Sequence, residues 1–75
     1  MMSVATSISV TVNGERREIA SGLMLPDLLR GANIDPEQSG IAVAVNGAVV
    51  RRVDWAETPI SEGDEIEIIT ATQGG

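Results

Sequence analysis

The stretch SISVTVNGERREI, residues 7–19, decides the fold of this chain. Apolar side chains at positions 8, 10 and 12 alternate with hydroxyl side chains at 7, 9 and 11, which is the period of a strand with one buried face. Asn13-Gly14 follows directly, and this pair readily adopts the positive φ angles of a type I′ turn. Residues 15–19 are therefore predicted to return antiparallel, so that the chain opens with a β-hairpin.

The hydrophobic period changes after this hairpin. Leucines at 25, 28 and 29 and an alanine at 32 recur at i, i+3, i+4 and i+7, which predicts a helix with one face on the sheet. Pro26 suits the first turn, where its missing N–H would be unpaired, and Asp27 complements the positive end of the helix dipole.

The sequence gives a weaker signal for the N-cap of this helix than for its C-terminal end. Neither Met24 nor Leu25 offers a side chain that accepts a hydrogen bond at the N-cap, unless Ser21 caps an earlier start. At the other end Gly31 and Asn33 both favour a stop.

Three further strands are predicted beyond a polar connector at 35–40. Residues 41–45 (IAVAV) indicate a strand that is buried on much of both faces and central in the sheet. A second Asn-Gly turn at 46–47 leads into a short strand at 48–50, residues 53–62 are predicted to be irregular, and residues 65–69 form the last strand. The result is an α+β fold with one helix on one face of a mixed five-strand sheet.

A chain of 75 residues has room for one domain. We assign residues 7–70 to it and expect residues 1–6 to be disordered. Residues 71–75 (ATQGG) lack apolar periodicity and end in two glycines, so we expect them to form a flexible tail.

Composition excludes several classes of function. Eleven carboxylates against five basic residues give a net charge of −6, which disfavours nucleic acid as a partner. No apolar run approaches the roughly 20 residues that span a bilayer, and the first residues resemble no targeting peptide. We therefore expect a cytoplasmic protein with no membrane and no nucleic-acid partner.

The sequence contains no histidine, lysine or cysteine. It therefore lacks the usual general base, the thiolate nucleophile and the soft metal ligands. Paired carboxylates would need a cleft that so small a chain can hardly enclose. We expect a protein that is not an enzyme and that binds no metal and no cofactor of its own.

Taken together, the motifs resemble those of the ThiS-type sulfur carriers within the ubiquitin-like β-grasp family. The resemblance covers nearly the whole chain and rests on their conjunction rather than on any one of them. The motifs are Val12-Asn13-Gly14, Leu25 with Leu28-Leu29, Ala44-Val45-Asn46-Gly47, Val50, Arg52, Trp55, Glu62-Gly63-Asp64 with Ile66, and Gly74-Gly75.

This resemblance implies a sheet whose first and last strands run parallel at its centre. It also implies a cycle in which an E1-like (ThiF-like) adenylyltransferase uses ATP to adenylate the carboxylate of Gly75. A persulfide, for example from a cysteine desulfurase, then supplies sulfur, and the thiocarboxylate feeds a ThiG-like thiazole synthase. The chain departs from the family at Met24, where a capping hydroxyl is common, and in its first six residues, which precede the usual start.

The tail suits this chemistry. Five extended residues span at most about 17 Å, so Thr72, Gln73 and Gly74 are predicted to thread the partner's active site ahead of Gly75. Glycine at both final positions keeps the tail thin and its carboxyl carbon unhindered.

Three residues outside the tail are candidate partner contacts: Trp55, Glu65 and Glu67. Trp55 either anchors a partner or covers the edge of the core. The acidic residues from 62 to 67 are expected near the base of the tail, where they either meet a basic rim on the activating enzyme or form a solvated strand face. The arginine pair 51–52 is interpreted as solvated surface.

Other readings of the sequence remain open. The small subunit of molybdopterin synthase also carries a Gly-Gly thiocarboxylate, although Arg52 followed by Trp55 favours the thiamine carrier. From a different class, the chain would serve as a ubiquitin-like protein modifier or a non-catalytic binding module.

Overall fold

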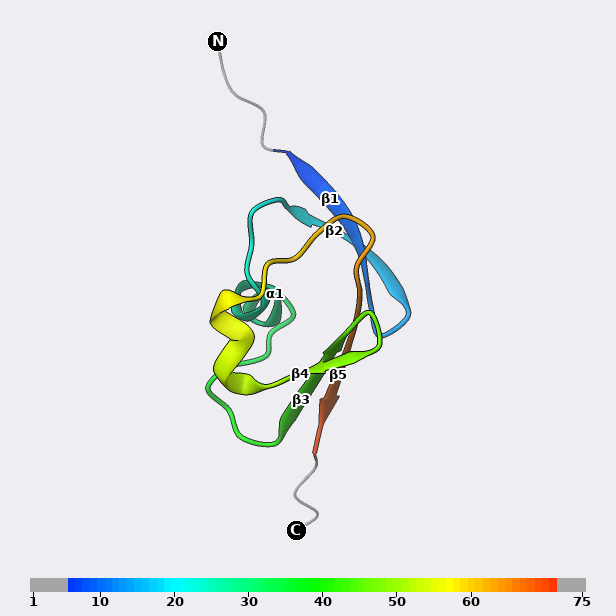
Figure 1. Ribbon diagram of the computed structural model, residues 1–75. Helices are drawn as coiled ribbons and strands as arrows, with labels where there is room; N and C mark the ends of the chain where they lie inside the picture. The colour runs from blue at the N-terminus through cyan, green and yellow to red at the C-terminus, as the bar shows by residue number, and fades with distance from the viewer. Residues whose placement is uncertain (1–5, 72–75) are drawn as a thin grey trace.

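A computed structural model describes residues 6–71. These residues form a five-stranded mixed sheet with one α-helix against one face, as predicted (Figure 1). The strand order is β2-β1-β5-β3-β4. The elements are β1 (Ser7–Val12), β2 (Glu15–Ala20), α1 (Leu25–Gly31), β3 (Ile41–Val45), β4 (Ala48–Val50), the 3₁₀ helix η1 (Arg52–Glu57) and β5 (Glu65–Thr70).

Both hairpins turn at the predicted Asn-Gly pairs. Asn13 and Gly14 have φ angles of 50° and 84°, and Asn46 and Gly47 have 53° and 85°, as a type I′ turn requires. β1 pairs antiparallel with β2 from Ser7↔Ala20 to Val12↔Glu15. The alternation in the sequence therefore predicted both the pairing and the buried face.

The two turn asparagines also hold β5, which the sequence analysis did not foresee. The side chain of Asn13 accepts a hydrogen bond from the Ile68 amide at 2.8 Å and donates one to the Ile68 carbonyl at 3.2 Å. Asn46 accepts from the Glu65 amide at 2.9 Å. These bonds join residues far apart in the sequence, so each asparagine fixes a turn and a strand position together.

β1 and β5 run parallel at the centre of the sheet, as the family resemblance implied, with Thr11 opposite Glu65. β5, and not β3, is the middle strand. The expectation that β3 is buried on much of both faces is wrong, because the helix covers only one face of the sheet. Val43 is buried on the helix side, whereas Ala42 is exposed.

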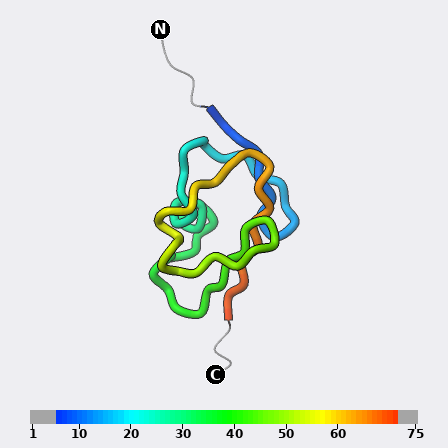
Figure 2. Tube along the Cα trace, viewed as in Figure 1, coloured from blue at the N-terminus to red at the C-terminus, as the bar shows by residue number. Residues whose placement is uncertain are grey.

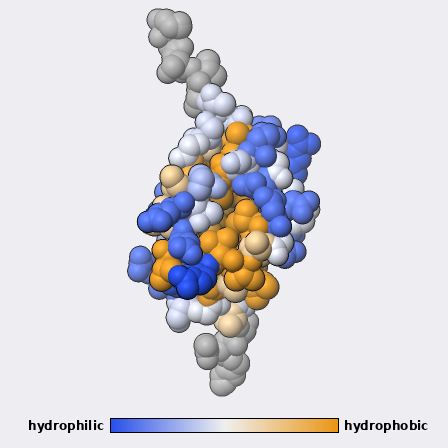
Figure 3. Space-filling view, in the orientation of Figure 1, coloured by the Kyte–Doolittle hydropathy of each residue, from blue (hydrophilic) through white to orange (hydrophobic). Residues whose placement is uncertain are grey.

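The core lies between the sheet and α1. Its central side chains are Leu25 and Leu29 of the helix, which are fully buried, packed with Val10, Val43 and Ile66 of the sheet. The remaining buried apolar residues are Val12, Leu28, Trp55, Ile60 and Ile68. Figure 3 shows apolar residues in a band across the face in view, with hydrophilic residues on both sides.

The N-cap residue of α1 is Met24, whose side chain makes no capping hydrogen bond. The Thr58 carbonyl accepts a hydrogen bond from the Leu25 amide at 2.8 Å, and the Asp27 carboxylate accepts one from the Met24 amide at 3.0 Å. Ser21 is not the N-cap. A distant segment thus supplies part of what a capping hydroxyl would supply.

The C-terminus of α1 ends in the motif that Asn33 indicated. Asn33 has φ 65°, and its amide donates to the Arg30 carbonyl at 3.0 Å. The Ile34 amide donates to the Leu29 carbonyl at 2.9 Å, which completes a Schellman arrangement.

The segment predicted to be irregular, 53–62, overlaps η1, which begins one residue earlier. Its turns are short-range, with the Asp54 amide donating to the Arg51 carbonyl at 2.8 Å and the Thr58 amide to the Trp55 carbonyl at 3.1 Å. A single 3₁₀ segment with one large apolar residue has no period to detect in sequence. Its position follows from the burial of Trp55, whose Nε1 donates to the Val50 carbonyl at 2.9 Å.

Leu28→Ala tests the assignment of the helix face. Leu28 is 5% exposed, and its truncation is expected to lower the free energy of unfolding by about 2 to 5 kcal/mol. A domain of this size is stable by only about 4 to 11 kcal/mol, so partial unfolding is expected near physiological temperature. Urea titration followed by circular dichroism measures the change.

The matched control for this prediction is Val53→Ala, because Val53 is 72% exposed. It is expected to change the free energy of unfolding by less than about 0.5 kcal/mol. Equal stability of the Leu28 variant and the control would contradict the assigned helix register.

Candidate functional site

The described chain leaves the sheet at the end of β5. Figure 2 shows that it enters the domain at β1 and leaves at the opposite end, after β5. The Ala71 amide donates to the Gly40 carbonyl at 2.7 Å, which continues the β3–β5 ladder beyond the Ile41↔Thr70 pair. The first residue of the expected tail is therefore held to the body of the domain. Thr72, Gln73, Gly74 and Gly75 lie outside the described residues, as do residues 1–5.

Gly40 is the residue that meets the chain at this exit. It has φ +81°, a backbone conformation that glycine adopts without strain. A Cβ at this position would lie 3.5 Å from the Ala71 carbonyl oxygen, which is ordinary contact. The backbone angle, rather than a lack of space, is thus the reason for glycine here.

An apolar surface borders this exit on the sheet face away from α1. Side chains of β5 alternate, so that Ile66 and Ile68 are buried while Ile69 is 64% exposed. Ile69 is paired with Ala42, and Ala44 is paired with Val49, which is 76% exposed. We call Ala42, Ala44, Val49 and Ile69 the open-face patch.

The open-face patch is bordered by carboxylates. Glu67 is opposite Ala44 in the β3–β5 ladder, and Glu65 shares its face of β5. Both glutamates line a shallow hollow between the two hairpin turns, with Thr11, Gly14 and Gly47. A contiguous apolar surface with a charged border is typical of a protein-binding site.

The acidic residues were predicted to lie together near the tail, and for most of them this is wrong. Glu65 begins β5, so about 17 Å of strand separates it from Thr70 at the exit. Glu62 and Asp64 precede β5 and bind backbone amides: Glu62 accepts from the Ser9 amide of β1 at 3.0 Å, and Asp64 accepts from the nearby Ser61 amide at 2.8 Å. Glu67 is the acidic residue of β5 nearest to the exit.

Trp55 is placed in the core rather than on a partner surface. Its side chain is 3% exposed, which agrees with the reading that it covers the core. Arg52 is exposed, as interpreted, and it also stacks on the Trp55 ring, with 4.4 Å between its Cζ atom and the ring centroid. The spacing i, i+3 in a 3₁₀ helix places two side chains on one side, and this signal was overlooked in the sequence. Arg51 does lie at the surface, 3.6 Å from Asp54.

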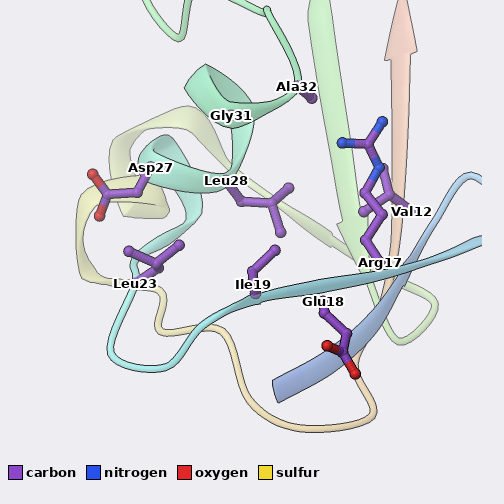
Figure 4. A pocket seen from close by; sticks show the side chains of 9 residues that line it. All are labelled: Val12, Arg17, Glu18, Ile19, Leu23, Asp27, Leu28, Gly31 and Ala32. Carbon is purple, nitrogen blue, oxygen red and sulfur yellow. The ribbon is translucent and has the colours of Figure 1, made fainter. Parts of the chain in front are cut away.

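A second hollow, of about 330 Å³, lies between β2 and α1 (Figure 4). Its lining is largely apolar, with Ile19 and Leu28 pointing toward one another. Asp27 at its rim points away and is engaged with the helix cap and with Arg30 at 3.2 Å.

Two other features are absent from residues 6–71. No group of three or more carboxylates lies close enough together to hold a metal ion in this part of the chain. Among the same residues, no helix has the length and apolar character to cross a bilayer.

Comparison with known proteins gives a consistent result. The model of the ThiS family matches residues 10–75. The sulfur carrier protein ThiS of Escherichia coli (strain K12) is 29% identical over 68 residues, covering 91% of this chain and all of that protein. An uncharacterized protein, ycf40 of Trieres chinensis, is 28% identical over the full length of both chains.

Solved structures show the same fold. The crystal structure of a thiamine biosynthesis protein (ThiS) from Geobacter metallireducens superposes with a TM-score of 0.76 at 27% identity, covering 91% of this chain and all of that one. An NMR solution structure of a thiamine biosynthesis protein from the same organism gives a TM-score of 0.73 at 26% identity, covering 91% and 88% of the two chains.

Proposed function

The chain belongs to the ThiS family, and from this we propose that it carries sulfur for thiamine biosynthesis as a thiocarboxylate on Gly75. It acts as a protein co-substrate and sulfur donor rather than as a catalyst. The observation that carries the proposal is the anchored exit at Ala71, at the end of the central strand and beside the open-face patch, in a chain that the family model matches up to Gly75.

Activation of the carboxylate is the first chemical step. An oxygen of the Gly75 carboxylate attacks the α-phosphorus of ATP in an E1-like (ThiF-like) partner and displaces pyrophosphate. The product is an acyl adenylate, in which AMP is a good leaving group. In this scheme the partner supplies the ATP site.

Sulfur enters in the second step. The terminal sulfur of a persulfide, such as that of a cysteine desulfurase, attacks the acyl carbon, AMP leaves, and an acyl disulfide forms. A further thiol reduces its S–S bond, which leaves the thiocarboxylate on Gly75 and a disulfide on the donor side. The thiocarboxylate then delivers its sulfur to a ThiG-like thiazole synthase.

The fixed exit and the open-face patch have different roles in this function. The patch offers apolar area for docking, and Glu67 and the net charge of −6 favour a partner with basic residues around its docking surface. The bond between Ala71 and Gly40 gives the tail a defined starting point. One part of the sheet thus docks on the partner, and another part directs the tail to the partner's active site.

Intact-mass spectrometry tests the proposal. The full chain is incubated with an E1-like enzyme, ATP and a persulfide donor, and its mass is measured before and after. We expect an increase equal to the difference between one sulfur and one oxygen atom, located by fragmentation to Gly75. An unchanged mass with an enzyme that is active on its own carrier would contradict the proposal.

The double variant Val49→Thr/Ile69→Thr tests the docking role of the open-face patch. Threonine keeps the β-branched shape that suits a strand while removing apolar surface. Loss of this buried area is expected to weaken binding to the E1-like partner by about tenfold or more. Isothermal titration calorimetry with the purified partner measures the change.

Val53→Thr is the matched control, because Val53 is 72% exposed but lies in η1 and not in the sheet. It is expected to bind as the wild type does. If the patch variant also bound normally, the partner would have to dock elsewhere on the molecule.

A further inference from the structure

The guanidinium of Arg52 joins two segments that are separate in sequence. It stacks on Trp55 at 4.4 Å, donates from Nη1 to the Pro36 carbonyl and donates from Nη2 to the Gln38 carbonyl. Hydrogen bonds from a charged donor are about twice as strong as neutral ones. The planar fork of arginine can reach both carbonyls while its face lies on the ring, which a lysine ammonium cannot do.

The platform under Arg52 is rigid. Trp55 is 3% exposed, and its Nε1 donates to the Val50 carbonyl at the end of β4. The ring is therefore fixed by the core on one side and by β4 on the other. A guanidinium held on this ring has a defined position relative to the sheet.

The segment that Arg52 holds is the connector of residues 35–40, between α1 and β3. Within the connector, the Asp35 side chain accepts from the Glu37 amide at 2.9 Å, and the Asp35 carbonyl accepts from the Gln38 amide at 2.9 Å. These bonds are local and do not place the connector on the domain. In the described chain, the buried ring of Pro36, the bond between Gly40 and Ala71 and the two bonds from Arg52 make this attachment.

The connector ends at Gly40, whose carbonyl accepts from the Ala71 amide at 2.7 Å. Only Ser39 separates Gly40 from the carbonyl at Gln38 that Arg52 binds. The contacts therefore run without a break from the core tryptophan through Arg52 and the connector to the point where the tail begins.

We propose that Arg52 is a positioning residue for the C-terminal tail. By clamping the connector on Trp55 it fixes Gly40, and the carbonyl of Gly40 sets the direction in which the chain leaves β5. This role rests on the proposed function, because the tail carries the reacting carboxylate. Its loss is expected to lower the rate at which the docked chain reacts and not the affinity for the partner. Arg52 contacts Trp55 of the core, whereas the open-face patch lies on the side of the sheet away from α1.

Amide hydrogen exchange tests the structural half of the proposal without any partner. In Arg52→Ala, exchange of the Ala71 amide is expected to accelerate by about tenfold or more. The Asn46 amide, which donates to Glu65 at the opposite end of the β3–β5 pair, is the internal reference and is expected to stay unchanged. Arg51→Ala is the matched control, because Arg51 pairs only with Asp54 at the surface among the described residues.

Adenylation kinetics test the functional half. With the E1-like partner, Arg52→Ala is expected to lower the rate at saturating carrier by about tenfold, while the Kd for the partner stays unchanged. Arg52→Lys retains the charge and can donate to one carbonyl. Its rate is expected to lie between those of the wild type and Arg52→Ala. All variants are compared below their unfolding transitions.

Several outcomes would overturn the positioning role. Unchanged exchange at Ala71 in Arg52→Ala would do so, and an equal acceleration at Ala71 and Asn46 would show that Arg52 stabilises the whole sheet instead. A weaker Kd with an unchanged saturated rate would make Arg52 part of the docking surface. Failure of the wild-type chain to be adenylated would overturn the proposed function and leave the exchange result standing by itself.

Discussion

A chain lacking Gly74 and Gly75 is expected to form no thiocarboxylate and to keep its free energy of unfolding. The shortened chain still ends in an α-carboxylate, now on Gln73, so the loss cannot be attributed to a missing functional group. The loss is expected because the tail becomes too short. Two extended residues span up to about 7 Å, and the reacting carbon must contact ATP inside the partner. The core is unaffected, since its last residue is Ile68.

Intact-mass spectrometry and a thermal melt, run on the same sample, measure both expectations. The matched control removes Ser3 and Val4, two residues from the other end and outside the region that the family model matches. This control is expected to be loaded with sulfur at the normal rate. Loss of the cooperative transition in the Gly74-Gly75 deletion would show that the tail contributes to the core, contrary to the proposed domain boundary.

The parts of the fold that could be predicted depend on short-range patterns. The alternation in residues 7–12 and the two Asn-Gly pairs defined both hairpins, because side-chain period and turn conformation are properties of neighbouring residues. The leucines at 25, 28 and 29 defined the buried helix face for the same reason. The parallel centre of the sheet, by contrast, followed from the family resemblance and not from the pattern.

The features that could not be predicted depend on contacts between distant residues. The Thr58 carbonyl caps α1, and Asn13 holds Ile68, although 55 positions separate the latter pair. Exposure of Ala42 was missed because an alternation of alanine and valine looks apolar on both faces. Which face of β3 is exposed to solvent depends on the arrangement of the sheet, which has one helix against one face.

The candidate site shows the same division. The expectation that Gly75 carries the chemistry came from the family resemblance, whereas the anchor of Ala71 on Gly40 depends on the pairing of β3 with β5. Trp55 covers the core, which is one of its two readings from the sequence, whereas the stacking of Arg52 on its ring was not predicted. Sequence spacing brought out the residues, and the fold assigned what each of them contacts.

Gly75→Ala is expected to slow adenylation by about a hundredfold while leaving the fold intact. The variant keeps an α-carboxylate of nearly normal acidity, so activation would proceed normally if it required only that group. The added methyl lies next to the reacting carbon, where it narrows the approach of ATP and then of sulfur. It also restricts the positive φ angles that glycine visits freely. Exchange of labelled pyrophosphate into ATP, catalysed by the E1-like partner, measures the rate.

Gly31→Ala is the matched control, since it adds the same methyl at the end of α1, where no atom lies within 4 Å of the new Cβ and the φ angle is not positive. It is expected to raise the free energy of unfolding slightly, by about 0.5 to 1 kcal/mol, and to leave pyrophosphate exchange unchanged. A difference confined to the Gly75 variant would locate the requirement in the tail rather than in glycine content or stability. Exchange at the wild-type rate in Gly75→Ala would contradict the threaded-tail mechanism, because an active site that encloses the last residue cannot admit a larger side chain without cost.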